Sequence, residues 1–119
     1  KQSTQAGVLT DAVCLAENTA ELIAASDSWT AFTALLGEGW RIPTRNDAGR
    51  MIRCAHFDTA GGEPSSDTTG NYYVEVEWFP AGEGDTGLMD GRIDVYWRNS
   101  TEPVYTLETA VYLGGGNPG

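Results

Sequence analysis

The stretch VLTDAVCLAENTAELIAA, residues 8–25, decides the fold of this chain. Its apolar residues recur in pairs at helical intervals, so that they line one side of a helix with 3.6 residues per turn. The other side of this helix carries the polar residues Asp11, Glu17, Asn18 and Glu21. No Pro interrupts the stretch, and it is rich in Ala, the strongest helix former. The pattern predicts a long amphipathic helix over residues 3–25, packed on the rest of the protein through Val8, Ala12, Leu15, Thr19, Leu22 and Ile23.

A second, shorter helix is predicted over residues 28–36. Ser26, Asp27 and Ser28 end the first helix and offer side chains that cap the next one. Four apolar residues share one face of this helix: Trp29, Phe32, Leu35 and Leu36. Gly37 and Gly39 end it, and an irregular connection rich in Arg and Asn begins at Pro43.

From residue 51 onward the apolar period changes from 3.6 to 2, which is typical of strands. Strands are predicted over residues 51–58, 71–79, 92–98 and 104–113, with loops at 60–70, 80–87 and 99–103. The short loops indicate antiparallel neighbours. The side chains predicted for the inner face are Val74, Val76, Trp78, Ile93, Val95, Trp97, Leu107 and Val111. On the opposite face Glu75 and Glu77 are expected in water, with Arg92 or Arg98 within reach.

Helices followed by a run of strands predict an α+β fold, with the long helix packed on a four-stranded antiparallel meander. The 119 residues suit one domain, which we expect over residues 1–113, followed by a flexible tail at 114–119. Because a single helix covers only one side of such a sheet, the other side is predicted to face water.

Composition limits the possible partners and cofactors. A formal net charge of -10, with 17 acidic and 7 basic side chains, disfavours binding to nucleic acid, which needs clustered Lys and Arg. Two Cys and one His cannot supply the four ligands of a structural zinc site. No stretch is apolar enough to span a membrane. The first residue is Lys1 rather than Met, so we expect a fragment or a processed form.

The glycine-rich segment GEGDTG, residues 82–87, formally matches the dinucleotide-binding pattern. That chemistry needs a helix N-terminus after the glycines, whereas here a strand follows, and Glu83 and Asp85 repel phosphate. A hairpin loop explains the segment better. Glu83, Asp85 and Asp90 could also ligate Ca²⁺, but their spacing matches no EF-hand. We therefore predict no cofactor and no metal.

Two sets of residues are candidates for catalytic groups. Glu75, Glu77 and Asp94 resemble the carboxylates of a glycosidase, but such an enzyme keeps one carboxyl in a dry pocket. Ion pairs on a solvated sheet face explain them better. His56 and Asp58, two residues apart, have no nucleophile elbow to complete a triad. We therefore predict no catalytic residue and no enzyme activity.

The state of the two cysteines and of one possible glycosylation site depends on the cellular compartment of the protein. Cys14 and Cys54 predict a disulfide in an extracytoplasmic protein and free thiols in a cytosolic one. Cys14 falls on the polar side of the long helix, so a bridge requires the segment around Cys54 to pass over that side. Asn99-Ser100-Thr101 is a formal glycosylation sequon and also an ordinary turn.

The run A-V-x-L-A-x-x-x-A-E resembles the helix of type IV pilin-like proteins, in particular minor pilins and pseudopilins of Gram-positive bacteria. It is made here by Ala12, Val13, Leu15, Ala16, Ala20 and Glu21. The resemblance implies the head of a structural subunit whose hydrophobic half-helix precedes Lys1. It also implies assembly with other pilin subunits through the N-terminal helix, in a cell-surface filament or in the pseudopilus of a secretion or DNA-uptake machine. The location implied is extracellular, with a membrane anchor before assembly.

The alternative is a stand-alone extracellular binding module that uses exposed aromatic side chains, namely Tyr73, Phe79, Tyr96 and Tyr112. The two functions differ in what precedes Lys1. A pilin-like subunit carries an apolar segment there, and a binding module does not.

Overall fold

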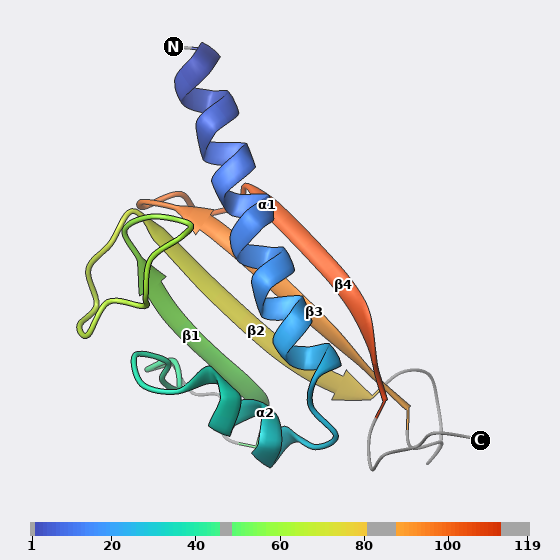
Figure 1. Cartoon of the computed structure of the whole chain (residues 1–119). Coiled ribbons are helices and arrows are strands. Elements are labelled where there is room, and N and C mark those ends of the chain that lie inside the picture. The colour runs from blue at the N-terminus through green and yellow to red at the C-terminus, as the bar shows by residue number, and fades with distance from the viewer. Residues whose placement is uncertain (1, 46–48, 81–87, 113–119) are drawn as a thin grey trace.

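Four antiparallel strands form one sheet in the order β1-β2-β3-β4, and helix α1 crosses one of its faces (Figure 1). The computed structural model describes residues 2–45, 49–80 and 88–112. Its elements are α1 (Gln2–Ala24), α2 (Trp29–Leu36), β1 (Met51–Phe57), β2 (Tyr72–Pro80), β3 (Leu88–Trp97) and β4 (Tyr105–Tyr112). The α+β class, the helix-then-strand order and the meander are therefore confirmed.

The core lies between α1 and the sheet face that the alternation predicted. Val74 pairs with Val95 and Val76 with Ile93 in the β2–β3 register, and all four side chains are fully buried. The buried residues of α1 are Ala12, Leu15, Ala16, Thr19 and Ile23, while Val8 and Leu22 are partly buried against the same core. Burying each large apolar side chain contributes about 1.5–3 kcal/mol.

Two details of the α1 contact were not expected from the helical pattern. Asp11, assigned to the solvated side, accepts a hydrogen bond of 2.7 Å from the Tyr72 hydroxyl of β2. At Gly91 of β3 a Cβ atom would lie 3.1 Å from Ile23 Cδ1, so the glycine allows the helix to approach the sheet closely. Both contacts fix the position of α1 over the strands.

Helix α2 closes one end of the core with aromatic contacts. Its Ser28 cap accepts a hydrogen bond from the Ala31 amide at 3.0 Å, as predicted from the sequence. The rings of Trp29 and Phe32 lie 5.1 and 5.0 Å from that of Trp78. Leu35, predicted on the apolar face of this helix, is 48% exposed, because α2 contacts the core through Phe32 and Leu36.

The sheet face turned away from α1, here called the polar face, is covered near β1. The connection between α2 and β1 (residues 37–50, described except for 46–48) pairs with the edge of β1, where Arg41 and Cys54 exchange two backbone hydrogen bonds of 2.8 Å. Ile52 and Cys54 on this face are only 1% and 3% exposed. The expectation that the whole polar face lies in water is therefore wrong, because the α2–β1 connection covers the part of this face next to β1.

The N-terminal turns of α1 extend past the sheet (Figure 1). Gly7, Leu9 and Thr10 are exposed, and Ala12 is the first buried residue described in the helix. The sheet thus covers the C-terminal part of α1 and leaves Gly7, Leu9 and Thr10 exposed, while Val8 still contacts the core.

The start of one strand differs from the prediction, and two further segments lie outside the described residues. Strand β3 begins at Leu88 rather than at Arg92, because Met89 pairs with both Pro80 of β2 and Val111 of β4. Residues 81–87, which belong to the expected loop, and the expected tail 114–119 lie outside the described residues.

Candidate functional site

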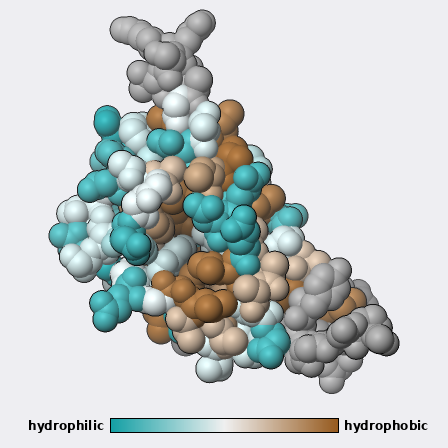
Figure 2. Space-filling model, viewed as in Figure 1, coloured by the Kyte–Doolittle hydropathy of each residue, from teal (hydrophilic) through white to brown (hydrophobic). Residues whose placement is uncertain are grey.

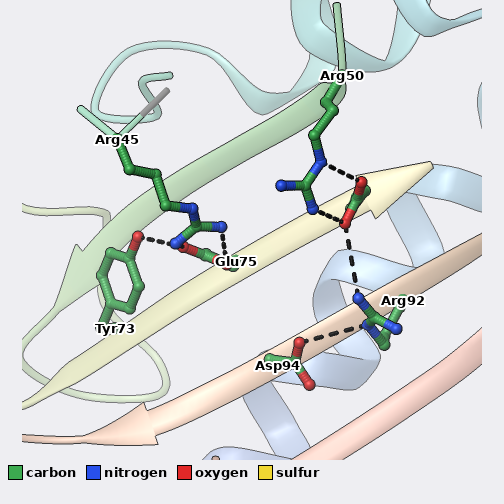
Figure 3. Close-up of polar contacts among 7 residues, drawn as sticks. Arg45, Arg50, Tyr73, Glu75, Arg92 and Asp94 are labelled. Carbon is green, nitrogen blue, oxygen red and sulfur yellow. Dashed lines mark hydrogen bonds and ion pairs between the residues drawn. The ribbon is translucent and has the colours of Figure 1, made fainter. Parts of the chain in front are cut away.

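The chemistry-bearing side chains of this chain gather on the polar face, where β2 carries two glutamates. Glu75 is 8% exposed, and the Arg45 guanidinium donates to both of its oxygens, from Nη1 to Oε2 at 2.6 Å and from Nη2 to Oε1 at 2.9 Å (Figure 3). The Tyr73 hydroxyl donates to the same Oε2 at 2.6 Å. Bidentate, charge-assisted hydrogen bonds of this kind are about twice as strong as hydrogen bonds between neutral groups.

A second ion-pair cluster lies further along the same face. Arg50 donates to Glu77 from Nε at 2.8 Å and from Nη2 at 2.6 Å. Arg92 of β3 lies between Glu77, at 3.6 Å, and Asp94, at 3.5 Å (Figure 3). The Thr106 hydroxyl of β4 donates to Asp94 at 2.6 Å. The network therefore joins the α2–β1 connection to three strands of the sheet.

The structure corrects the prediction for Glu75 and Glu77. They are largely covered, and their main partners are Arg45 and Arg50 from the connection rather than arginines of the neighbouring strand. Of the two arginines predicted, Arg92 contacts Glu77, whereas the Arg98 guanidinium lies over the Trp97 ring, 4.4 Å from its centre.

Burial of Glu75 and Glu77 raises the question of acid–base chemistry again, since paired buried carboxylates are common in active sites. Here both Glu75 oxygens already accept hydrogen bonds from Arg45, and one accepts a further bond from Tyr73. A glycosidase acid needs a carboxyl group that can hold and release a proton beside the substrate. What this arrangement does is fasten the connection to the sheet.

A row of aromatic rings crosses the polar face beside the ion pairs. The His56 ring lies 4.9 Å from that of Tyr73, which lies 5.7 Å from that of Tyr96. Burial lowers the pKa of His56, and the charge of Arg41 lowers it further. Burial raises the pKa of Tyr73, with a further contribution from its hydrogen bond to Glu75, and burial raises that of Tyr96. At neutral pH the row is therefore uncharged.

The aromatic residues considered as a ligand face do not all meet. Tyr73 and Tyr96 are adjacent, but Phe79 lies further along β2, where the Arg92 guanidinium covers its ring at 5.4 Å. The side chain of Tyr112 lies outside the described residues. Glu75 and Glu77 separate Tyr73 from Phe79 along the strand.

The two cysteines lie on opposite sides of the sheet and are free thiols. Cys14 belongs to α1, and its sulfur accepts a hydrogen bond of 3.7 Å from the Asn18 amide. Cys54 lies on the polar face, where it is the cross-strand partner of Glu75. Burial raises the pKa of the Cys54 thiol. The disulfide considered from the sequence is not formed, because the β-sheet separates the two side chains.

The remaining sequence candidates do not converge on a site. Asp58 is exposed just past the end of β1, whereas the His56 ring lies against that of Tyr73 within the sheet. Asn99 is exposed in the turn after β3.

The segment 82–87, with Glu83 and Asp85, lies outside the described residues, and Asp90 is half-buried in β3. Within residues 2–45, 49–80 and 88–112, no three His, Cys, Asp or Glu side chains are grouped to hold a metal ion. None of the described helices combines the length and apolar character needed to cross a membrane.

Arg45 and Arg50 are the site residues that sequence reasoning missed. One signal was present in the sequence, the concentration of arginines in the connection. The register of β1 on β2 adds that the apolar Ile52 shares a face with Glu77. Together these indicate that something covers the polar face beside β1.

Comparison with known proteins adds no relative: no family model, curated protein or solved structure matches this chain. Any functional assignment therefore depends on the sequence and on the geometry described above.

Proposed function

We propose that this chain is the head of a type IV pilin-like structural subunit, a minor pilin or pseudopilin of a cell-surface filament or of a secretion or DNA-uptake pseudopilus. The observation that carries the proposal is the arrangement of α1. Its C-terminal part packs on the sheet through Ala12 to Ile23, and its N-terminal turns extend past the sheet with Leu9 49% exposed. A helix that extends beyond its own domain is suited to packing against neighbouring subunits.

The pilin-like run supports the same proposal. It spans residues 12–21, in the part of α1 that contacts the sheet, and its Ala12, Leu15 and Ala16 are buried there. In this proposal the apolar half-helix that precedes Lys1 anchors the subunit in the membrane before assembly, and the head then lies outside the cell.

The first test is the coding sequence upstream of Lys1. The proposal expects about 20 consecutive apolar residues there, the length that spans a bilayer as a helix. A reading frame that starts within a few codons of Lys1 would overturn it.

The second test uses the full-length gene product in its native host. Leu9→Gln changes the exposed turn of α1 and should reduce the amount of this protein in filaments sheared from the cell surface. Leu88→Gln is the matched control, because Leu88 is exposed to a similar extent (53% against 49%) and lies on β3. Equal amounts of the two variants in the filament fraction would contradict assembly through α1.

A further inference from the structure

A groove of about 250 Å³ opens on the α1 side of the molecule, where α1, α2 and the loop after β1 meet. Its walls are mostly apolar, with Leu15 and Leu22 from α1, Leu35 and Leu36 from α2, and Trp40 and Phe57 beside them. Figure 2 shows hydrophobic side chains at the surface between the C-terminal part of α1 and α2. Leu35 is 48% exposed, so this apolar surface is accessible.

The surroundings of the groove are acidic. Glu63 is the one charged residue among those that line it, and Glu17 and Glu21 are exposed on the same turns of α1 without lining the groove. Residues 2–40, which include both helices, contain five acidic side chains and no Lys or Arg. The ion-paired arginines of the network, Arg45, Arg50 and Arg92, belong to the opposite side of the sheet. On the helix side of the sheet, Arg53 of β1 lies over the Trp29 ring, which does not line the groove. The charged residue that lines the groove is acidic, so the local charge there is negative.

We propose that this groove binds a cationic amphipathic segment of a partner protein, which places one or two bulky apolar side chains between α1 and α2 and its Lys or Arg side chains near the acidic rim. The volume favours side chains over a whole small ligand, because pockets for such ligands usually measure about 300–1,000 Å³. An apolar groove is a common site for the apolar face of an amphipathic helix.

The charge also argues for a partner of a different kind from this chain. A second copy carries the same net charge of -10, and like charges brought together across an interface oppose association. The proposal does not depend on the proposed filament function, because the groove lies at the C-terminal part of α1, away from Leu9.

The probes are three synthetic peptides of about 14 residues, long enough for about four helical turns. One has Leu on one helical face and Lys on the other, the second has Glu in place of Lys, and the third scrambles the Leu/Lys order. Fluorescence anisotropy of the labelled peptides measures binding. We expect the amphipathic Leu/Lys peptide to bind at least about tenfold more tightly than the other two, and to weaken as salt rises.

Two matched pairs of variants separate binding in the groove from general attraction to an acidic protein. Leu35→Gln should weaken binding at least about fivefold, whereas Leu88→Gln, a control at a similarly exposed leucine, should leave it unchanged. Glu63→Lys should weaken it about fivefold, whereas Glu108→Lys, which alters the net charge equally on the polar face, should change it less than about twofold.

Circular dichroism first establishes that each variant is folded. Equal effects within either pair would overturn the proposal, as would equal binding of the amphipathic and scrambled peptides. Concentration-dependent self-association that Leu35→Gln abolishes would also overturn it, because the occupant would then be a second copy of this chain.

Discussion

Replacing Arg45 by Ala removes the main partner of a buried carboxylate and should destabilise the protein by about 1–3 kcal/mol. Glu75 is 8% exposed and would keep only the hydrogen bond from Tyr73. Removing one partner of a fully buried pair costs about 3–5 kcal/mol, and an exposed pair contributes about 0.2–1 kcal/mol. The Arg45 side chain is 52% exposed, so water screens the pair and the expected value lies between these limits.

A double-mutant cycle with Glu75→Leu isolates the interaction from the other effects of each substitution. If the pair is formed, Arg45→Ala should cost little once Glu75 is replaced, which gives a coupling energy of about 1–2 kcal/mol. Urea denaturation followed by tryptophan fluorescence gives the four free energies of unfolding. Glu108→Gln serves as the control, because Glu108 is exposed on β4 and its loss should change stability by less than about 0.5 kcal/mol.

Hydrogen exchange provides a second, local measurement. The Arg41 amide donates to the Cys54 carbonyl at 2.8 Å, so its protection reports whether the connection stays on β1. We expect Arg45→Ala to reduce this protection more than that of the central strand amides. If Arg45→Ala changes stability by less than about 0.5 kcal/mol and shows no coupling to Glu75, the carboxylate lies in water and the assignment of a covered polar face is refuted.

Three further outcomes follow from individual side chains. Leu15→Ala should lower the free energy of unfolding by about 2–5 kcal/mol, because Leu15 is 3% exposed in the core; an unchanged urea midpoint would place it outside the core. A thiol reagent should modify Cys14 in the folded protein, but Cys54, which is 3% exposed, only after unfolding; fast reaction of both would contradict the burial of Cys54. Because the pKa of folded His56 is lowered, its contribution to stability is present above about pH 6.5, the value for the unfolded chain, and is lost as pH falls through the folded pKa. In urea unfolding from about pH 7 to pH 5, His56→Gln should therefore lose less stability than the parent, and parallel curves would argue against a buried His56.

The elements and the core could be predicted from the sequence because each depends on a local pattern. From Val74 to Trp78, strand β2 alternates apolar and polar residues, and Val74, Val76 and Trp78 are all buried on the face toward α1. The helical pattern placed Leu15 and Ile23 in the core for the same reason. Such patterns work because the side-chain period of a helix or strand sets which residues share a face.

The same reasoning failed for Glu75 because alternation identifies two faces and does not say what covers the second one. The partner of Glu75 is Arg45, thirty positions away in the sequence. Nothing in the period of β2 encodes that contact, and the α2–β1 connection that brings it has no regular pattern of its own. The neighbouring strand was the nearest known source of cations, which is why Arg92 and Arg98 were expected instead.

From the sequence by itself come the α+β class, the order of the elements, the core face and the acidic side chains of the first helix, since each depends on residue type and on spacing along one segment. The tertiary structure decided which surfaces remain open: the connection with Arg45 and Arg50 covers one side of the polar face, and Leu35 lines an exposed groove instead of the core. It also decided that Cys14 and Cys54 stay apart, on either side of the sheet. The physical reason is that a residue's own segment sets the direction of its side chain, whereas its burial and its partners depend on segments that are distant in the chain and meet only in the fold.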